Sequence, residues 1–408
     1  MSNAALPAER ALWHSRDVRR LVGLSLLAFS SFCLLLGSAP AWASAGGVSE
    51  NRAGLVTTAM LACTVLVQGA VPALVRRCGL GPTLAAGLVA LGAPAPLYAA
   101  GHHLGLLLAA AAVRGAGFAV VTVVGSTLAA AVASPERRGE SIGLYGLAIA
   151  VPNLLCVPGG VALAQHGAFR WVAYASALPV LAVPLALALG RSAHSPVRTA
   201  QSQSEHARPE RGRAVVARVA APAFVLLTAT LAGGGLVTYL PIQLPTGALA
   251  TAALLGFGAT AALGRWRAGA LSDRFGTGLL LPAAQVAAVL GTALVALGLG
   301  KGSAPVLVAG AVLFGAGYGA VQNLTLVQAF AAAGPGHATT ASALWNAAFD
   351  AGTGIGAIVV GALAATGLGV PIVLALTALL MLTALPLTAR RHGQARRLPC
   401  GAACPRRK

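Results

Sequence analysis

Asp350 is a carboxylate in the middle of an apolar stretch, "ALWNAAFDAGTGIG" (Ala343–Gly356). If that stretch crosses a membrane, burying the charge costs roughly 2.5–3.5 kcal/mol on insertion scales, so a functional role is expected. A carboxyl group withdrawn from water can take up and release a proton near neutral pH, as proton coupling requires. The alternatives are that it binds a cationic solute directly, or that it stays neutral and hydrogen-bonds two helices together.

Arg114 is a basic residue deep within a second apolar stretch, about ten residues from its nearer end. An arginine at such a depth requires water, a carbonyl oxygen or an acid as its partner. Its long side chain could instead reach the membrane surface, but the distance to that surface disfavours this explanation. We therefore predict a functional role for Arg114 as well as for Asp350.

Neutral polar and aromatic side chains form a third group of candidates, spread over several apolar stretches. Asn346 lies four residues before Asp350, so the two share one face of a helix. Each side chain of this group could equally tie two helices together. A binding site built from aromatic rings, neutral amides and one acid suits an amphipathic organic solute better than a polyanion. The predicted lining residues are Tyr145, Asn153, Tyr239, Gln243, Tyr318, Gln322 and Asn346.

The composition indicates which elements carry these residues. Of the 408 residues, 57% are hydrophobic and only 9% are charged, with a mean hydropathy of +0.80, whereas soluble proteins carry about 25% charged residues. Long apolar runs recur along the whole chain, which is typical of a polytopic helical membrane protein. We therefore predict an all-α fold. The twelve predicted spans cover about residues 21–43, 54–75, 82–101, 104–132, 141–164, 170–189, 219–242, 247–264, 278–299, 304–331, 340–364 and 368–388.

Basic residues predict the orientation of these spans. If both termini are cytoplasmic, 24 of the 28 basic residues fall on the cytoplasmic side and three fall outside, as the positive-inside rule requires. The net charge of +19 is therefore assigned to topology and to anionic lipid headgroups rather than to nucleic acid. We predict a multi-pass protein of the inner (cytoplasmic) membrane. Its predicted parts are a cytosolic arm (1–20), an N-terminal six-helix bundle (21–190), a flexible cytosolic linker (191–218), a C-terminal six-helix bundle (219–388) and a basic cytosolic tail (389–408).

Internal matches support the division into halves. "VRGAGFAVV" (Val113–Val121) matches "LFGAGYGAV" (Leu313–Val321) at an offset of 200 residues. "RRCGLG" (Arg76–Gly81) lies 197 residues before "DRFGTG" (Asp273–Gly278). Several matches in register indicate a duplicated six-helix unit.

These segments resemble a known family. "GALSDRFGTG" (Gly269–Gly278), which follows the eighth predicted span, resembles the loop signature Gly-x-Leu-x-Asp-Arg-x-Gly of the major facilitator superfamily. "RGAGF" (Arg114–Phe118) resembles that family's Arg-and-Gly motif. "VPNLLCVPGG" (Val151–Gly160) is a looser match to the Pro/Gly motif of its drug and metabolite:proton antiporter branch. The resemblance implies two six-helix bundles, with Arg114 near the substrate cavity and linked to proton exchange.

The same resemblance implies a gate at the border between membrane and cytosol. Asp273 and Arg274 can pair with arginine or face a helix N-terminus in one state and separate in another. A turn whose charges only set the topology is the alternative. In the first half, Pro72 and Arg76 replace the Gly and the Asp of the signature. The predicted gate residues are Gly269, Asp273, Arg274, Gly276, Arg77 and Gly79.

Transport is the predicted function. No Gly-rich loop carries the Lys of a nucleotide-binding P-loop, so an ion gradient must supply the energy. We predict proton-coupled efflux of a small amphipathic drug or metabolite; the alternative is a proton-coupled importer of a sugar or an organic acid, since alternating access is reversible. His102 and His103 lack the HExxH context of a metalloprotease. No enzyme, catalytic residue, metal or cofactor is therefore expected, and the protein is expected to be a monomer.

Overall fold

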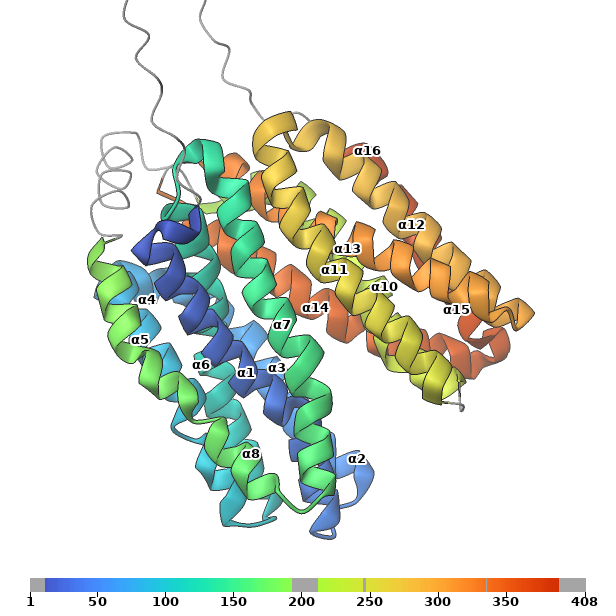
Figure 1. Ribbon diagram of the computed structural model, residues 1–408, viewed down its shortest axis with the longest axis horizontal. Helices are drawn as coiled ribbons and strands as arrows, with labels where there is room; N and C mark the ends of the chain where they lie inside the picture. The colour runs from blue at the N-terminus through green and yellow to red at the C-terminus, as the bar shows by residue number, and fades with distance from the viewer. Residues whose placement is uncertain (1–11, 193–211, 245–246, 335, 389–408) are drawn as a thin grey trace, which may run out of the picture.

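The computed structural model describes residues 12–192, 212–244, 247–334 and 336–388, and these residues are predominantly helical (Figure 1). The predicted linker and the two predicted terminal segments lie largely outside the described residues. The first half contains η1 (Leu12–His14), α1 (Arg16–Ala45), α2 (Glu50–Ala53), α3 (Leu55–Gln68), α4 (Val71–Cys78), α5 (Leu80–Gly92), η2 (Ala95–Ala100), α6 (Leu104–Ala131), η3 (Pro135–Arg137), α7 (Arg138–Gln165), α8 (Phe169–Ala175) and η4 (Leu178–Ala182). The second half contains α10 (Gly212–Gln243), α11 (Gly247–Phe275), α12 (Thr277–Lys301), α13 (Ala304–Ala333), α14 (Ala338–Leu363), the π-helical η5 (Ala364–Leu368), α15 (Gly369–Thr383) and α16 (Leu385–Thr388).

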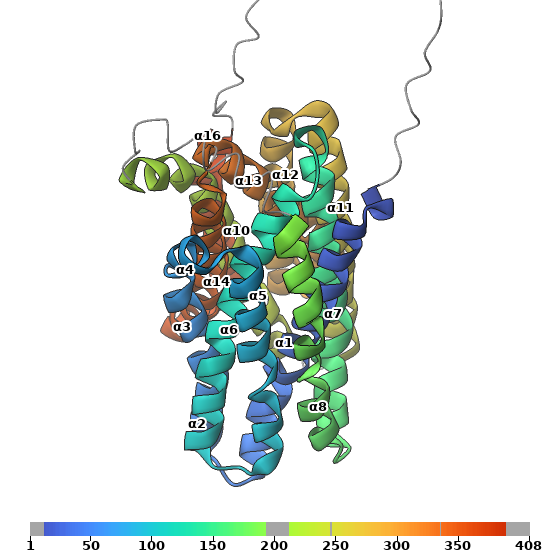
Figure 2. The same cartoon turned by 90° about the vertical axis from the view of Figure 1, so that its left-hand side faces the viewer.

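Among the described residues, eleven helices are long and apolar enough to cross a membrane. The twelfth span is divided, because α3 and α4 together pass the same test but are bent by 58° at the break that follows Gln68. This architecture confirms the predicted all-α polytopic fold. Seen from the side, most of the long helices run along one common direction, as spans of a membrane protein do (Figure 2).

One predicted boundary is wrong in a way that affects the site. The eighth span was expected to end at residue 264, whereas α11 continues to Phe275. Arg265 and Asp273 therefore lie within a helix and not in a loop. The error arose because an arginine was taken as the end of an apolar run, although a helix surrounded by protein can bury one.

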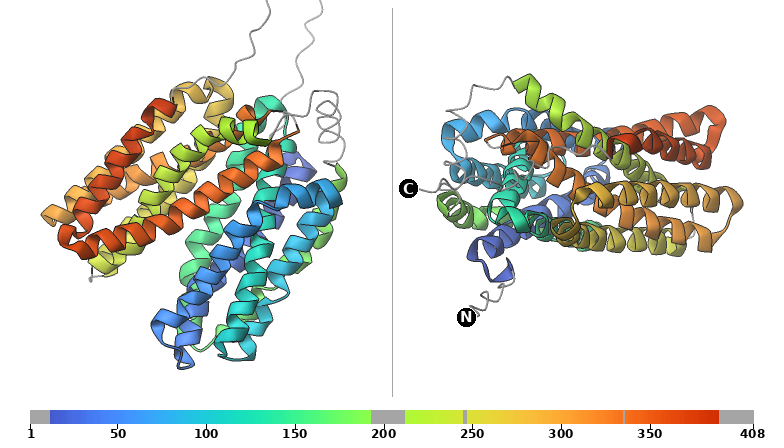
Figure 3. Two further views of the ribbon diagram at one scale, coloured as in Figure 1. Left: turned by 180° about the vertical axis from the view of Figure 1, so that it is seen from behind. Right: turned by 90° about the horizontal axis from the view of Figure 1, so that it is seen from above.

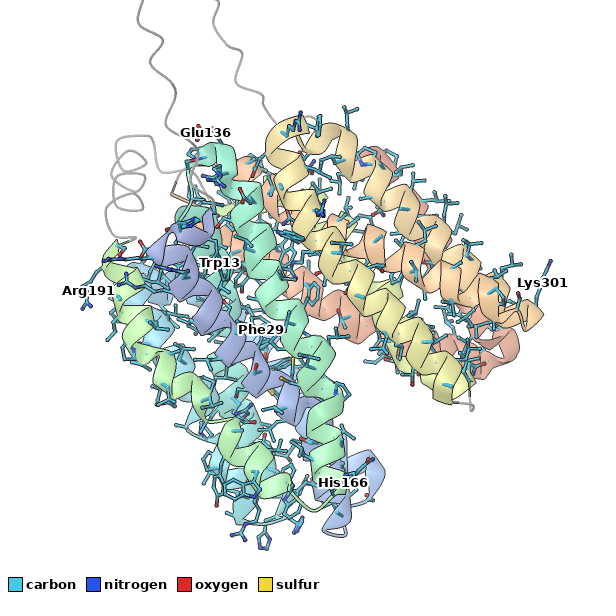
Figure 4. The ribbon with its side chains drawn as sticks, viewed as in Figure 1. Trp13, Phe29, Glu136, His166, Arg191 and Lys301 are labelled. Carbon is cyan, nitrogen blue, oxygen red and sulfur yellow. The ribbon has the colours of Figure 1, made fainter. Side chains whose placement is uncertain are left out.

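The two halves form two helix bundles that meet at one end and diverge toward the other (Figures 1 and 3). We call the end where they meet the closed end; it carries η3 and the junction of α11 with α12. Glu136 lies at this end, while His166 and Lys301 lie at the separated ends of the two bundles, which we call the open end (Figure 4). The seam between the bundles positions the candidate site residues.

The internal repeat seen in the sequence is also a repeat of contacts. Gly115 of α6 packs against the carbonyl group of Met60 in α3, and Gly315 of α13 packs against that of Phe257 in α11. The two glycines are 200 residues apart and their two partners 197, which are the two offsets found in the sequence. Each half therefore joins its paired helices by the same close backbone approach.

Gly79 and Gly276 end one helix and begin the next in the two halves. Gly79 lies between α4 and α5 with φ of 84°, and Gly276 lies between α11 and α12 with φ of 76°. This left-handed region is strained for side chains with a Cβ atom. Gly79 and Gly276, two of the three glycines among the predicted gate residues, thus have a structural reason to be glycine.

Candidate functional site

The seam between α7 and α11 is tightest at the closed end. A Cβ atom added to Gly139 would collide with the carbonyl group of Gly269, and one added to Gly143 would lie 2.8 Å from the carbonyl oxygen of Trp266. Nearer the open end, a Cβ atom at Gly258 would make an ordinary contact of 3.6 Å with the Leu154 side chain. Contact between these helices therefore changes along the seam from backbone against backbone to a glycine backbone against a side chain.

Asp273 bridges the two halves at the closed end. Its Oδ1 accepts a hydrogen bond from the backbone N–H of Gly139, and its Oδ2 accepts one from that of Glu140, both at 2.8 Å. These N–H groups belong to the first turn of α7, where the helix has no internal acceptor for them and its dipole favours an anion. A carboxylate from the second half thus caps a helix of the first half, one of the two contacts expected for this residue.

The remaining predicted gate residues divide between the two halves. Arg274 is exposed and lies over the ring of Phe275, with its Cζ atom 5.2 Å from the ring centroid. Arg77, and Arg76 beside it, lie in the last turn of α4 and are exposed. The first half therefore places basic groups where the second half has the capping carboxylate, so the capping contact occurs at one of the two corresponding turns.

Asp350 also bridges the halves, at greater depth. Its Oδ2 accepts a hydrogen bond of 2.6 Å from Nε2 of Gln68, which is the last residue of α3. Asp350 lies 12 residues into α14, about 18 Å along the helix axis, which is near the middle of a hydrocarbon layer about 30 Å thick. Gln68 is completely buried, and its Oε1 has no hydrogen-bond partner among the described residues.

This pairing suits a carboxyl group that changes its protonation state. An amide carries both donors and an acceptor. Gln68 can donate to the ionised carboxylate through its N–H, and after an amide flip it can accept a hydrogen bond from the protonated form. Neither protonation state leaves the carboxyl group without a partner.

Asn346 takes part in a third polar contact between the halves. Its Nδ2 donates to the Ser126 hydroxyl of α6 at 3.2 Å, and the Ser342 hydroxyl of α14 donates to the Val123 carbonyl oxygen at 2.7 Å. The hydroxyl groups of Ser126 and Ser342 also contact each other. Asn346 therefore joins α6 to α14 and is one helical turn from Asp350, as its spacing predicted.

Arg114 is completely buried within the first half. Its Nη1 donates to the carbonyl oxygen of Leu91 at 2.6 Å, and its Nη2 donates to the carbonyl oxygen of Ser31 at 3.0 Å. The guanidinium group does not reach the membrane surface. Its contacts hold α1 and α5 against α6.

Arg265 is a second buried arginine, which the sequence analysis did not single out. Its side chain is 6% exposed and crosses the seam to pack against Gly146 of α7. Its Nη1 donates to Oε1 of Gln322 at 2.9 Å, and its Cζ atom lies 5.9 Å from the ring centroid of Trp345. It lies ten residues before Phe275, the last residue of α11, which is about 15 Å from that end along the helix axis. Counting back from the true end of the helix would therefore have revealed that Arg265 is deep within it.

The predicted lining residues are only partly brought together. Tyr318 and Gln322 lie beside Arg265, and Tyr145 is within electrostatic range of the same guanidinium group. Asn153 is exposed and donates to the Ile149 carbonyl oxygen of its own helix. Two others lie away from this group: Tyr239 has its hydroxyl against Gly361, and Gln243 is an exposed side chain at the end of α10. Among the described residues, no three His, Cys, Asp or Glu side chains lie together as a metal site would require.

Comparisons with known proteins agree with this architecture. The family model of the Major Facilitator Superfamily matches residues 20–357, whereas no curated protein is matched as a sequence relative. The fucose:proton symporter FucP of E. coli has a similar structure, with a TM-score of 0.68 and 15% identity over 91% of this chain and 97% of that one.

Two further solved structures share the fold. The human organic anion transporter MFSD10 has a TM-score of 0.70 and 16% identity, over 92% of this chain and 100% of its own. The proton:xylose symporter XylE has a TM-score of 0.70 and 14% identity, over 91% of this chain and 94% of its own. Because the family model covers most of the chain and the twelve spans fit it, the protein belongs to the major facilitator superfamily and is a multi-pass membrane transporter.

Proposed function

We propose that the protein is a proton-coupled secondary transporter of the antiporter type, which exports a small amphipathic organic molecule by alternating access. The hydrogen bond between Asp350 and Gln68 carries this proposal, because it holds a carboxyl group between the two halves near mid-membrane depth. A residue that couples proton binding to transport must sense the relative position of the halves. Asp350 belongs to one half and its partner to the other.

The contacts at the closed end are assigned to the gate. With both termini in the cytoplasm, the closed end faces the cytoplasm, and this arrangement corresponds to the outward-facing state. Opening toward the cytoplasm then requires Asp273 to release the N-terminus of α7 and Asn346 to leave Ser126. Arg114 is assigned an indirect part in coupling, since it holds α1 and α5 against α6.

In this proposal the protein acts as a monomer in the cytoplasmic membrane. Its basic residues at the closed end lie near anionic lipid headgroups, and its cargo is a small molecule together with protons. No cofactor is required, because the proton gradient supplies the energy.

Import by proton symport is the second candidate. FucP and XylE are proton symporters by name. The same carboxyl group serves a symporter if its protonation raises the affinity for the solute, and an antiporter if protonation lowers it.

Proteoliposomes with an internal pH-sensitive dye test both candidates. A gradient of each of several lipophilic amines, dyes and sugars is imposed, and solute-driven proton flux is recorded for the wild type and for Asp350→Asn. We expect the variant to lose proton flux but to keep solute exchange, because an amide cannot carry the proton.

Asp17→Asn is the matched control. Asp17 pairs with Arg20 near the start of α1, away from the seam, so its variant should retain the flux. Proton movement opposite to the solute supports antiport, and movement with the solute supports symport. Undiminished flux in Asp350→Asn would reduce Asp350 to a tie between helices and remove the basis of the proposal.

A further inference from the structure

We propose that Arg265 binds a carboxylate group of the transported solute, so that the solute is an amphipathic monoanion. This inference rests on the proposed transport function and specifies its solute. It concerns a residue that neither the family motifs nor the proton site includes.

The guanidinium group of Arg265 is buried without a counter-charge. No described acidic side chain forms an ion pair with it. Among the described residues it makes a single hydrogen bond, from Nη1 to Gln322, and its buried Nε has no partner. A buried charge with unmet donors is unfavourable unless another group completes the site.

The unbonded part of Arg265 has the geometry that a carboxylate needs. With Nη1 engaged by Gln322, the Nε and Nη2 groups remain, and they form one edge of the planar fork. Such an edge can bind both oxygens of a carboxylate through two parallel hydrogen bonds. The buried Nε of Arg114 also has no partner among the described residues, but both terminal nitrogens of Arg114 donate to protein oxygens inside one half, so it has no unbonded edge.

The surroundings specify the rest of the solute. The ring of Trp345 lies beside the guanidinium group, and Tyr318 is within its electrostatic range. Aromatic rings of this kind contact an apolar body. Arg114 and Arg265 are the two buried charged side chains among the described residues, and the carboxyl group of Asp350 is the one acid at comparable depth among them. A solute with one negative charge would balance the second arginine.

The seam makes this contact dependent on the transport state. In the arrangement seen here, with the bundles in contact at the closed end, Gly146 of α7 covers the side chain of Arg265, including its Nε. Separation of α7 from α11 uncovers the Nε–Nη2 edge. The carboxylate is therefore bound when the closed end opens and released when it closes, which couples the charge of the solute to the gate.

Matched probes that differ in charge test the inference. The two sets are phenylacetate, phenylacetamide and phenethylamine, and indoleacetate, indoleacetamide and tryptamine. Affinity is measured by thermal stabilisation of the full-length protein in detergent, which requires no gradient, and flux is then measured in proteoliposomes. The variants are Arg265→Gln and Arg265→Lys. Arg267→Gln is the control, since Arg267 is an exposed arginine two residues along the same helix.

We expect at least one carboxylate to bind about tenfold more tightly than its amide. Arg265→Gln should weaken the binding of that carboxylate by about 10- to 100-fold without affecting the binding of the amide. This change corresponds to the loss of one charge-assisted contact. Arg265→Lys should fall between, because lysine keeps the charge but not the fork. Arg267→Gln should match the wild type.

The inference is overturned if no carboxylate binds, if amides or amines bind equally well, or if correctly folded Arg265→Gln keeps the preference. Proton-coupled flux of amides or amines alone would leave the proposed function standing without this inference. Carboxylate binding that depends on Arg265, without proton-coupled flux, would support this inference and contradict the proposed function.

Discussion

The two halves share one helix arrangement but place different residues at corresponding points of the seam. By the offset of 197, Asp273 of the second half corresponds to Arg76 of the first, and Arg265 corresponds to Gln68. By the offset of 200, Asn346 corresponds to Gly146. In the contacts that Asp350, Asp273 and Arg265 make across the seam, the second half supplies the charged side chain, and the first half supplies a neutral amide, backbone N–H groups or a glycine.

The difference separates scaffold from function. Positions that join helices within a half are kept in both copies, as Gly115 and Gly315 show. The three seam positions compared above differ between the copies, which fits the proposal that a charge on the seam responds to movement between the bundles. The buried charge of the first half, Arg114, is instead satisfied by oxygens of its own bundle.

Replacing the two buried arginines, one at a time, should give the largest difference in stability between variants. Arg114→Leu removes buried hydrogen bonds from a charged donor to Leu91 and Ser31, so we expect a loss of about 2–4 kcal/mol in unfolding free energy. Arg265→Gln loses one such bond and should change stability much less. Melting temperatures in detergent measure both. An Arg114→Leu protein that melts like the wild type but no longer couples to protons would make Arg114 a direct coupling residue.

Removing the capping carboxylate should give an intermediate effect. Asp273→Asn weakens two hydrogen bonds to the N-terminus of α7, and for a partly exposed group this is worth about 1 kcal/mol. We expect a several-fold increase in the fraction of molecules whose bundles have separated at the closed end. Distances between spin labels at Glu136 and Leu279 report it, in a background without the native cysteines.

Arg77→Gln, in the corresponding turn of the first half, is the control for Asp273→Asn and should leave the distances unchanged. Equal shifts in both variants would show that net charge at the closed end, and not the cap, controls opening.

Introducing the missing carboxylate into the first half should give the smallest effect. In Arg76→Asp the new acid corresponds to Asp273, and the first turn of α14, at Thr339 and Thr340, corresponds to the residues that Asp273 caps. A second cap would stabilise the state in which the bundles meet at the closed end by less than about 1 kcal/mol, and it would slow the turnover of transport. Faster turnover would indicate that the corresponding turns are not equivalent in space.

Much of the fold followed from elementary patterns. Long apolar runs predicted the helices, and two offsets predicted the duplication that the glycine contacts display. The residues of the loop signature led to the family that the family model then showed. The assignment of domain boundaries, the direction of transport and the roles of the site residues stay predictions.

The site was less accessible to sequence reasoning. Asp350 was found because an acid in an apolar run is conspicuous, but nothing in the order of residues paired it with Gln68, 282 positions away. Arg265 was missed because it stands near other arginines at an apparent helix end. Asn153 and Gln243 were proposed as lining residues from their type alone; both side chains are exposed, and their place in a lining stays a prediction.

The sequence by itself determined that the chain crosses the membrane as helices, because the transfer of apolar side chains from water is a local property that sums along a segment. It also determined which residues carry charge at depth. Only the tertiary structure decided which of these charges is satisfied inside one bundle and which lies on the seam. That distinction depends on the packing of helices distant in the sequence, which brings Leu91 and Ser31 to the two terminal nitrogens of Arg114 and brings only Gln322 to those of Arg265 among the described residues.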